Sequence, residues 1–164
     1  MRDIKFRGKS AATGDWIYGF LVPVPDGISG WAIVGDHFTL RDVVEDGNDV
    51  LTTEEYCQVL NDTICQYTNH SDMNEAPIYE GDIIAIQEQG QEEQVGIIKY
   101  GTYNNPWSNE ATHQGFFVEW IGERGGALRR DMAFWTMQRH VSVVGNVWDN
   151  PDIIQEAETS IKTD

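Results

Sequence analysis

Short apolar runs recur along the whole chain, and turn-forming residues separate each run from the next. The clearest runs are residues 16–22 (WIYGFLV), 95–100 (VGIIKY) and 141–148 (VSVVGNVW). They are rich in aromatic and β-branched residues, which strands prefer, and Gly, Pro, Asn and Asp lie between them. Many short strands in series predict a mainly β protein, a barrel or roll with extra β-hairpins and little helix.

Weaker runs of the same kind extend this prediction to most of the chain. Residues 31–34 are expected to form the return arm of a hairpin that begins with residues 16–22. Polar segments between the runs are expected to be loops. The further expected strands are residues 4–6, 56–60, 63–67, 83–86 and 116–121, and the expected loops are residues 69–77, 87–94 and 101–114.

One segment fits two kinds of secondary structure. In residues 128–139, Met132, Trp135 and Arg139 are spaced to share one face of a helix, but the apolar run within the segment suits a strand equally. The pattern therefore leaves helix and strand open here.

The C-terminus carries a clearer helical signal. Asn150 is followed by Pro151, and this pair is typical of a helix N-terminus. Residues 153–164 are therefore expected to form a short acidic helix or tail.

Acidic residues outnumber basic ones, and their distribution is uneven. The formal charge is -16, and residues 42–98 contain fourteen Asp and Glu but no Lys or Arg. Because phosphate binding depends on Lys and Arg, this composition disfavours nucleic acid as a partner without excluding it. The acidic segment either serves solubility or offers a face to a basic protein, as a nucleic-acid mimic would. The first nine residues are basic instead, with Arg2, Lys5, Arg7 and Lys9.

Other features concern compartment and chemistry. The N-terminus lacks an apolar segment of the signal-peptide type, and no apolar run approaches the ~20 residues that span a bilayer. Cys57 and Cys65 form no CxxC motif, so two reduced thiols in a cytoplasm are expected. No zinc-ligand spacing, phosphate-binding glycine loop or nucleophile motif is present. The sequence therefore predicts no catalytic residue, no metal or cofactor, and no membrane contact.

Several motifs, in order along the chain, carry a resemblance to a known family. The most specific is residues 78–84 (IYEGDII). Together they resemble the YopX family of phage and prophage proteins over most of residues 1–22 and 63–152. The other matching segments are residues 1–9, 14–19, 63–68, 96–100 and 144–151.

The resemblance implies an SH3-like barrel or β-roll, in a protein of phage or prophage origin acting in the cytoplasm of a bacterial host. It implies a single domain over residues 1–152, with a barrel-like core at about 63–150 and a variable insertion at about 23–56. The insertion matches no family pattern, and residues 69–77 lack the lysines and glycine that the family has there. The family implies no established activity.

The family motif brings two carboxylates together, and we consider two roles for them. Glu80 and Asp82 could form an acid pair or bind a metal, but a hard-cation site needs further oxygen ligands. Tyr79 and Gly81 are typical of a tight turn that enters a strand, where Asp82 can accept a nearby backbone N–H. We therefore expect a structural motif.

A glycine in the last strand suggests a second structural motif. Gly145 is expected to mark a bulge or a close backbone approach, and Asn146 to cap a neighbouring turn. Recognition of a ligand by Asn146 is the alternative.

Arginines near the aromatic residues of the C-terminal half are the best candidates for an anion-binding patch. They bind nucleic acid in one interpretation, and in the other they pair with acidic residues of a neighbouring subunit. A stacking platform for bases would need such a basic groove. The patch consists of Arg124, Arg129, Arg130 and Arg139.

Together these observations favour a non-enzymatic accessory protein that acts by binding. The partner is a host or phage protein, or a second copy in a homo-oligomer. The alternative is a nucleic-acid-associated SH3-like module in phage replication or regulation, or an acidic mimic of nucleic acid that inhibits a host protein.

Overall fold

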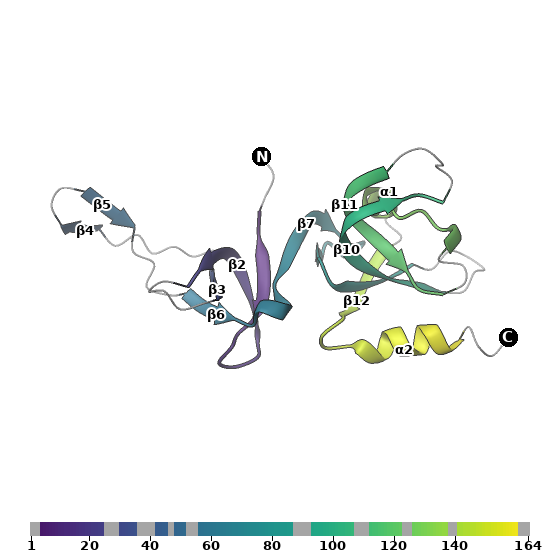
Figure 1. Ribbon diagram of the computed structural model, residues 1–164, viewed down its shortest axis with the longest axis horizontal. Coiled ribbons are helices and arrows are strands. Elements are labelled where there is room, and N and C mark those ends of the chain that lie inside the picture. The colour runs from purple at the N-terminus through teal and green to yellow at the C-terminus, as the bar shows by residue number, and fades with distance from the viewer. Residues whose placement is uncertain are drawn as a thin grey trace. The chain divides into compact units, whose positions relative to one another are not determined.

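The computed structural model describes residues 4–24, 30–35, 42–45, 48–51, 56–86, 93–106, 112–122, 126–137 and 141–160. Most of these residues lie in antiparallel strands, so the prediction of a mainly β protein with little helix is confirmed. The chain divides into two compact units, Met1–Gln66 and Tyr67–Asp164, which we call the first and the second unit (Figure 1).

The first unit is a small sheet that rolls back on itself. Its strands are β1 (Phe6–Lys9), β2 (Trp16–Pro23), β3 (Trp31–Val34) and β6 (Tyr56–Val59). They follow the order β6-β3-β2-β1, and every neighbouring pair is antiparallel. The end of β6 then returns to the end of β1, where the Leu60 N–H donates to the Lys9 carbonyl at 2.9 Å.

The inside of this roll holds small and aliphatic residues. A Cβ added to Gly8 would lie 3.0 Å from the Cβ of Val59, and Ile33 and Val59 are almost fully buried. Gly19 permits β2 and β3 to approach, because at its φ of 154° an added Cβ would lie 1.9 Å from the Val34 carbonyl oxygen. Alternate residues of a strand point to opposite faces, so the other face of β1 and β2 forms the outside of the roll.

The predicted variable segment, residues 23–56, contributes β3 to this sheet and forms a separate hairpin. That hairpin pairs β4 (Asp42–Glu45) with β5 (Asn48–Leu51). The sequence prediction of one domain over residues 1–152 with an insertion at about 23–56 stays a prediction.

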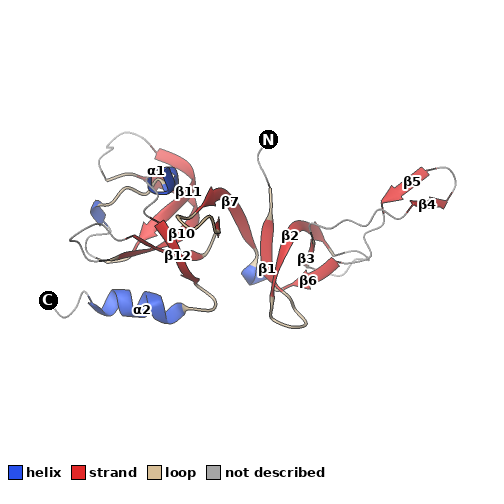
Figure 2. Ribbon diagram, turned by 180° about the vertical axis from the view of Figure 1, so that it is seen from behind, coloured by secondary structure: helices blue, strands red, loops and turns tan. Residues whose placement is uncertain are grey.

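The second unit contains a four-stranded sheet above an apolar core. The sheet consists of β9 (Asp82–Ile86), β10 (Gln94–Asn104), β11 (Thr112–Trp120) and β12 (Val141–Asn146) in the order β11-β10-β9-β12 (Figure 2). The core cluster is Ile78, Ile84, Ile86, Ile98, Val118, Trp120, Met132, Trp135 and Val141.

Short segments extend both edges of this sheet. Beyond β11, the Val118 N–H donates to the Arg130 carbonyl, and beyond β12 the Met73 N–H donates to the Val141 carbonyl, each at 2.9 Å. Within the described ranges, no ladder joins β11 to β12, so the sheet stays open. The narrower prediction of an SH3-like barrel is therefore not confirmed.

The prediction of a long polar loop at residues 101–114 is wrong at both ends. β10 continues to Asn104 and β11 begins at Thr112, in a ladder that pairs Gly101 with Gly115. The ladder forms between backbone groups, so polar side chains do not prevent it. The aromatic ring of Tyr103 also stacks on that of Phe117, with 5.1 Å between ring centroids.

The loop predicted at residues 69–77 is shorter in the structure. β7 (Cys65–Ser71) and β8 (Pro77–Tyr79) pair across a tight turn. The Asp72 carboxylate accepts the N–H groups of Asn74 and Ala76 within the turn, and the Val143 N–H on β12. One carboxylate therefore shapes the turn and fixes it to the sheet.

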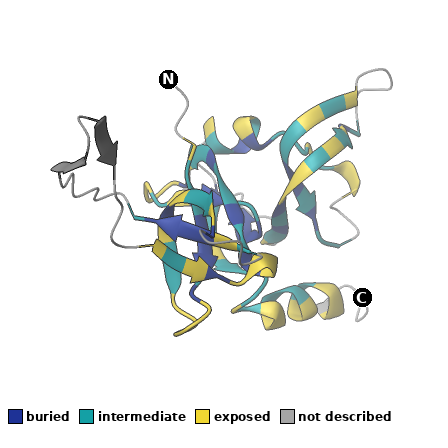
Figure 3. Ribbon diagram, turned by 60° about the vertical axis from the view of Figure 1, so that its left-hand side comes forward, coloured by how far each residue is buried: buried dark blue, intermediate teal, exposed yellow. Residues whose placement is uncertain are grey.

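The two segments with helical signals both contain helices. The ambiguous segment, residues 128–139, forms α1 (Met132–Met137), and residues 138–140 lie outside the described ranges. α2 (Pro151–Ser160) begins at Pro151, as the Asn-Pro pair predicts, and its surface is largely exposed (Figure 3). The side-chain oxygen of Asn150 accepts a backbone N–H from outside the helix, that of Asn146, at 3.2 Å.

Candidate functional site

The family motif forms a turn whose carboxylate is used inside the protein. Asp82 is 1% exposed, and its Oδ2 accepts the Tyr79 N–H at 2.8 Å. The Gly81 N–H donates to the Ile98 carbonyl at 2.8 Å, which joins the turn to β10. Gly81 has a φ of +77°, and an added Cβ would lie 2.3 Å from the ring of Trp148. Only glycine fits here, for reasons of both backbone and space.

The second carboxylate of the motif has a different environment. Burial raises the pKa of the Glu80 carboxyl, and a hydrogen bond from the Tyr100 backbone acts in the opposite direction. Gly81 separates Glu80 from Asp82 at the start of β9, and the described residues bring no group of three His, Cys, Asp or Glu together as metal ligands.

Gly145 and Asn146 build the corner that packs on this turn. A Cβ added to Gly145 would lie 2.6 Å from Oδ1 of Asn150. The side-chain oxygen of Asn146 accepts the N–H groups of Trp148 and Asp149, at 3.1 and 2.9 Å. The corner closes on the family motif because the Val147 N–H donates to the Gly81 carbonyl at 3.0 Å. These residues hold the end of β12 against the start of β9.

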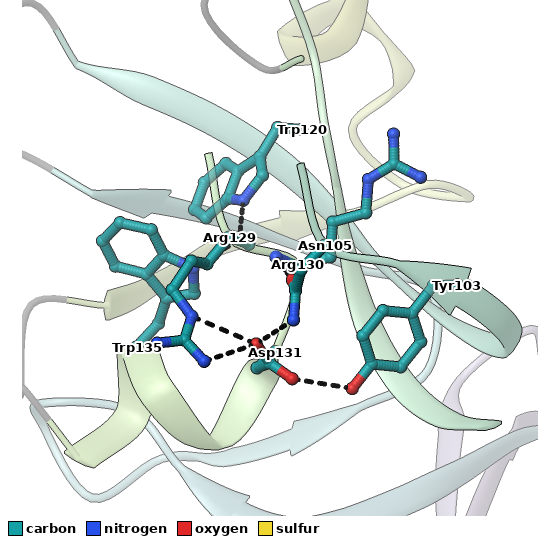
Figure 4. A network of polar contacts seen from close by, with 7 residues as sticks. All are labelled: Tyr103, Asn105, Trp120, Arg129, Arg130, Asp131 and Trp135. Carbon is teal, nitrogen blue, oxygen red and sulfur yellow. Dashed lines mark hydrogen bonds and ion pairs between the residues drawn. The ribbon is translucent and has the colours of Figure 1, made fainter. Parts of the chain in front are cut away.

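Two arginines of the predicted patch, Arg129 and Arg130, lie beside a polar network centred on Asp131 (Figure 4). Its Oδ1 accepts the Tyr103 hydroxyl at 3.0 Å. Its Oδ2 accepts Nδ2 of Asn105 at 2.5 Å and two guanidinium nitrogens of Arg129 at 3.0 and 3.2 Å. Asn105 in turn accepts the Arg130 N–H at 2.9 Å. The network fastens the segment before α1 to the end of β10.

The shifted pKa values of Asp131 and Tyr103 agree with a structural role for this network. Burial alone would raise the pKa of the Asp131 carboxyl, but hydrogen bonds from Asn105, Arg129 and Tyr103 hold its pKa below the usual range. Burial, together with the hydrogen bond to Asp131 and its negative charge, raises the pKa of the Tyr103 hydroxyl to about 12. At neutral pH the carboxylate is therefore ionised and the phenol neutral, and neither group exchanges a proton near pH 7.

Two tryptophans fix the same segment from the core side. The indole N–H groups of Trp120 and Trp135 both donate to the Arg129 carbonyl, at 2.7 and 2.8 Å (Figure 4). The two rings meet edge to face, with 5.2 Å between centroids. A carbonyl oxygen has two lone pairs, and here both are used.

The structure describes two of the four arginines in the predicted patch. The guanidinium of Arg129 is held by Asp131 and lies 4.6 Å from the ring centroid of Phe134. The guanidinium of Arg130 points away from Asp131 (Figure 4). Arg124 and Arg139 lie outside the described residues.

A third candidate surface lies on the outside of the roll in the first unit. The register of β1 and β2 pairs Arg7 with Tyr18 and Lys9 with Trp16. The register of β2, β3 and β6 places Phe20 and Tyr56 on either side of Val34. Directly paired residues share a face, so these side chains belong to one surface. We call it the outer face, and it comprises Arg7, Lys9, Trp16, Tyr18, Phe20 and Tyr56.

Aromatic side chains dominate the exposed part of the outer face. Tyr18 is 49%, Phe20 36% and Tyr56 45% exposed. Arg7 is only 7% exposed, and its guanidinium lies 4.6 Å from the ring centroid of Trp16. The ammonium of Lys9 lies 5.5 Å from the same ring. The face therefore combines exposed aromatic area with a positive edge, in a chain whose formal charge is -16.

The sequence prediction did not identify the outer face, although a signal was present. Cations alternate at residues 5, 7 and 9, and aromatic residues alternate at 16, 18 and 20. Each period of two marks one face of a strand. Placing the two faces together requires the register between β1 and β2, which the sequence alone does not provide.

The comparison with protein families decides the lineage of this chain. The family model YopX (YopX protein) matches residues 5–155. The chain belongs to the YopX family. This confirms the resemblance that the sequence motifs indicated. The matched residues include the outer face, the Asp131 network and the family motif.

A solved structure shares the fold of this YopX protein. It is described as "Crystal structure of protein EF1440 from Enterococcus faecalis", and it superposes with a TM-score of 0.58 at 20% sequence identity. The alignment covers 94% of this chain and 99% of the other. At this identity the likeness concerns the fold alone.

No curated protein matches the chain. Among the described residues, no helix has the length and apolar character needed to span a membrane.

Proposed function

We propose that this YopX protein is a non-catalytic accessory protein of phage or prophage origin, which acts in the bacterial cytoplasm by binding a protein partner. The observation that carries the proposal is the outer face of the first unit. Tyr18, Phe20 and Tyr56 expose aromatic area on one side of a single sheet. Exposed apolar area of this kind marks protein interaction sites, and Tyr and Phe are enriched in them.

The construction of the outer face suits recognition. The aromatic residues project from paired strands, so their backbone positions are fixed before a partner arrives. Binding therefore costs little ordering of the backbone, which favours affinity. Within this surface the guanidinium of Arg7 packs against the ring of Trp16, and Lys9 provides a cation beside the same ring.

We also propose that the second unit is the SH3-like β-roll that the family motif suggests. The segments that extend its edges, at Arg130 beyond β11 and at Met73 beyond β12, support this assignment. In such a roll the family motif and the corner at Gly145 serve the scaffold. The binding surface is then the outer face of the first unit.

Nucleic acid is the weaker candidate for the partner. The formal charge of -16 opposes phosphate, and Arg129 in the predicted patch is already paired with Asp131. Arg130 is the residue to replace in a test of this alternative, because only the backbone N–H of Arg130, and not its side chain, takes part in the Asp131 network. Salt-dependent binding of single-stranded DNA that disappears in Arg130→Glu would favour a nucleic-acid module. If the protein instead mimics nucleic acid to inhibit a host protein, its partner is still a protein.

The proposal is tested by affinity capture from host extract with matched baits. The baits are the wild type, the double variant Tyr18→Ser/Phe20→Ser, and the control Tyr100→Ser. Tyr100 is 52% exposed and lies in the second unit, so the control removes an exposed tyrosine elsewhere. We expect a host or phage protein to be captured by the wild type and the control, and to be depleted about tenfold or more with the double variant.

Circular dichroism first establishes that all three baits are folded. Equal capture of every protein by the double variant and the wild type would show that the outer face is not the binding surface. Capture of nothing beyond the bait itself would contradict a host partner.

A further inference from the structure

A second surface of the molecule complements the outer face in charge. α2 spans ten residues and carries Asp152, Glu156 and Glu158 but no Lys or Arg. Its Ile153, Ile154 and Ala157 are each partly exposed. The helix is thus acidic and amphipathic.

Apolar, acidic and uncharged polar side chains occupy different sides of α2. With about 3.6 residues per turn, Ile153, Ile154 and Ala157 share one side of the helix. Glu156 and Glu158 border that apolar side, one on each edge. Gln155 and Thr159 lie on the opposite side. An apolar stripe between carboxylates fits a surface that offers aromatic rings beside a cation.

The dimensions of the two surfaces also agree. A ten-residue helix is about 15 Å long. The exposed rings of the outer face lie on β2 and β6, which are two inter-strand steps of about 4.8 Å apart, or roughly 10 Å. A helix of this length is therefore long enough to reach from Tyr18 and Phe20 to Tyr56.

We propose that the outer face of one copy binds α2 of a second copy, with the apolar side of α2 on the aromatic rings and a glutamate beside Lys9. This inference rests on the proposed function, because it names the occupant of the proposed binding surface. The attraction is local: a chain with a formal charge of -16 repels its copies at long range, but Lys9 meets carboxylates at the contact.

The contact joins two different surfaces, so each copy in an assembly still has one surface of each kind to offer. Such head-to-tail contacts produce rings or open chains, whereas a contact between identical surfaces ends at a dimer. The association is therefore expected to proceed beyond the dimer as the protein concentration rises.

The test is a charge exchange, measured by analytical ultracentrifugation at low and high salt. The variants are Lys9→Glu, Glu158→Lys and the two combined, with Gln155→Lys on the opposite side of α2 as the control. We expect the wild type and Gln155→Lys to associate with rising concentration. Each charge variant alone should weaken association about tenfold or more, and the combination should restore it to within about threefold of the wild type.

Glu158 is exposed on a surface helix, so Glu158→Lys reports on the contact even if Lys9→Glu also lowers the stability of the first unit. A monomeric wild type at every concentration, or a combined variant without restored association, would overturn the inference. If host-protein capture still depends on Tyr18 and Phe20 in that case, the proposed function stands and only the second copy as occupant is rejected.

Discussion

Several single residues hold the backbone of the second unit in place, each through hydrogen bonds that involve a backbone group. Asp72 accepts three backbone N–H groups, Asn146 accepts two, and the Arg129 carbonyl accepts both indole N–H groups. Burial alone would raise the pKa of the Asp72 carboxyl, but the N–H groups of Val143, Ala76 and Asn74 hold its pKa below the usual range. Polar residues at these positions therefore define turns and corners.

Gly81→Ala is expected to destabilise the protein by about 2 kcal/mol or more, because the new methyl group meets the Trp148 ring while the backbone is strained. The matched control is Gly14→Ala. Gly14 has a similar φ of +79°, but an added Cβ there meets no atom within 4 Å. Chemical denaturation of both variants separates strain from steric overlap. Equal losses of stability would mean that the Trp148 contact contributes nothing.

At the level of elements, the existence of strands and the hairpin of residues 16–22 with 31–34 were predictable, but the register between strands was not. Residues 16–22 and 31–34 were found because aromatic and branched residues mark strands at any register. The outer face was missed because it depends on the pairing of Arg7 with Tyr18 across two strands. The arginine patch stays a prediction, and the sequence does not show that Tyr103 and Asn105 lie beside the Asp131 carboxylate that holds the Arg129 guanidinium.

The segment that joins β11 to α1 provides a prediction about pH. The lowered pKa of Asp131 means that its ionised form stabilises the fold above the unfolded pKa of about 4. This contribution is lost as the pH falls through the lower pKa of the folded state. We expect Asp131→Asn to cost about 1–3 kcal/mol at pH 7 and to reduce the difference in stability between pH 5 and pH 3.

Denaturation curves over this pH range measure the effect on stability. A spectroscopic titration of tyrosine gives a second readout, since the pKa of Tyr103, about 12, should fall towards the ordinary value of about 10 when Asp131 is replaced. An unchanged tyrosine titration together with an unchanged pH dependence would show that the network contributes no stability.

The two units of the molecule use their side chains in different ways. Within the second unit, buried aliphatic residues, the family motif and the Asp131 network are all used internally. The first unit is a thin roll that places aromatic side chains on its outside. The family match extends across both, over residues 5–155, so the outer face belongs to the YopX domain.

The proposed function requires a partner to cover the outer face when the protein acts. Hydroxyl-radical footprinting measures this directly, by comparing side-chain oxidation in the dilute purified protein with that in host extract. We expect the oxidation rates of Tyr18, Phe20 and Tyr56 to fall severalfold in the extract, while that of the exposed Tyr100 stays constant. Unchanged rates at Tyr18, Phe20 and Tyr56, or an equal fall at Tyr100, would contradict the proposed function.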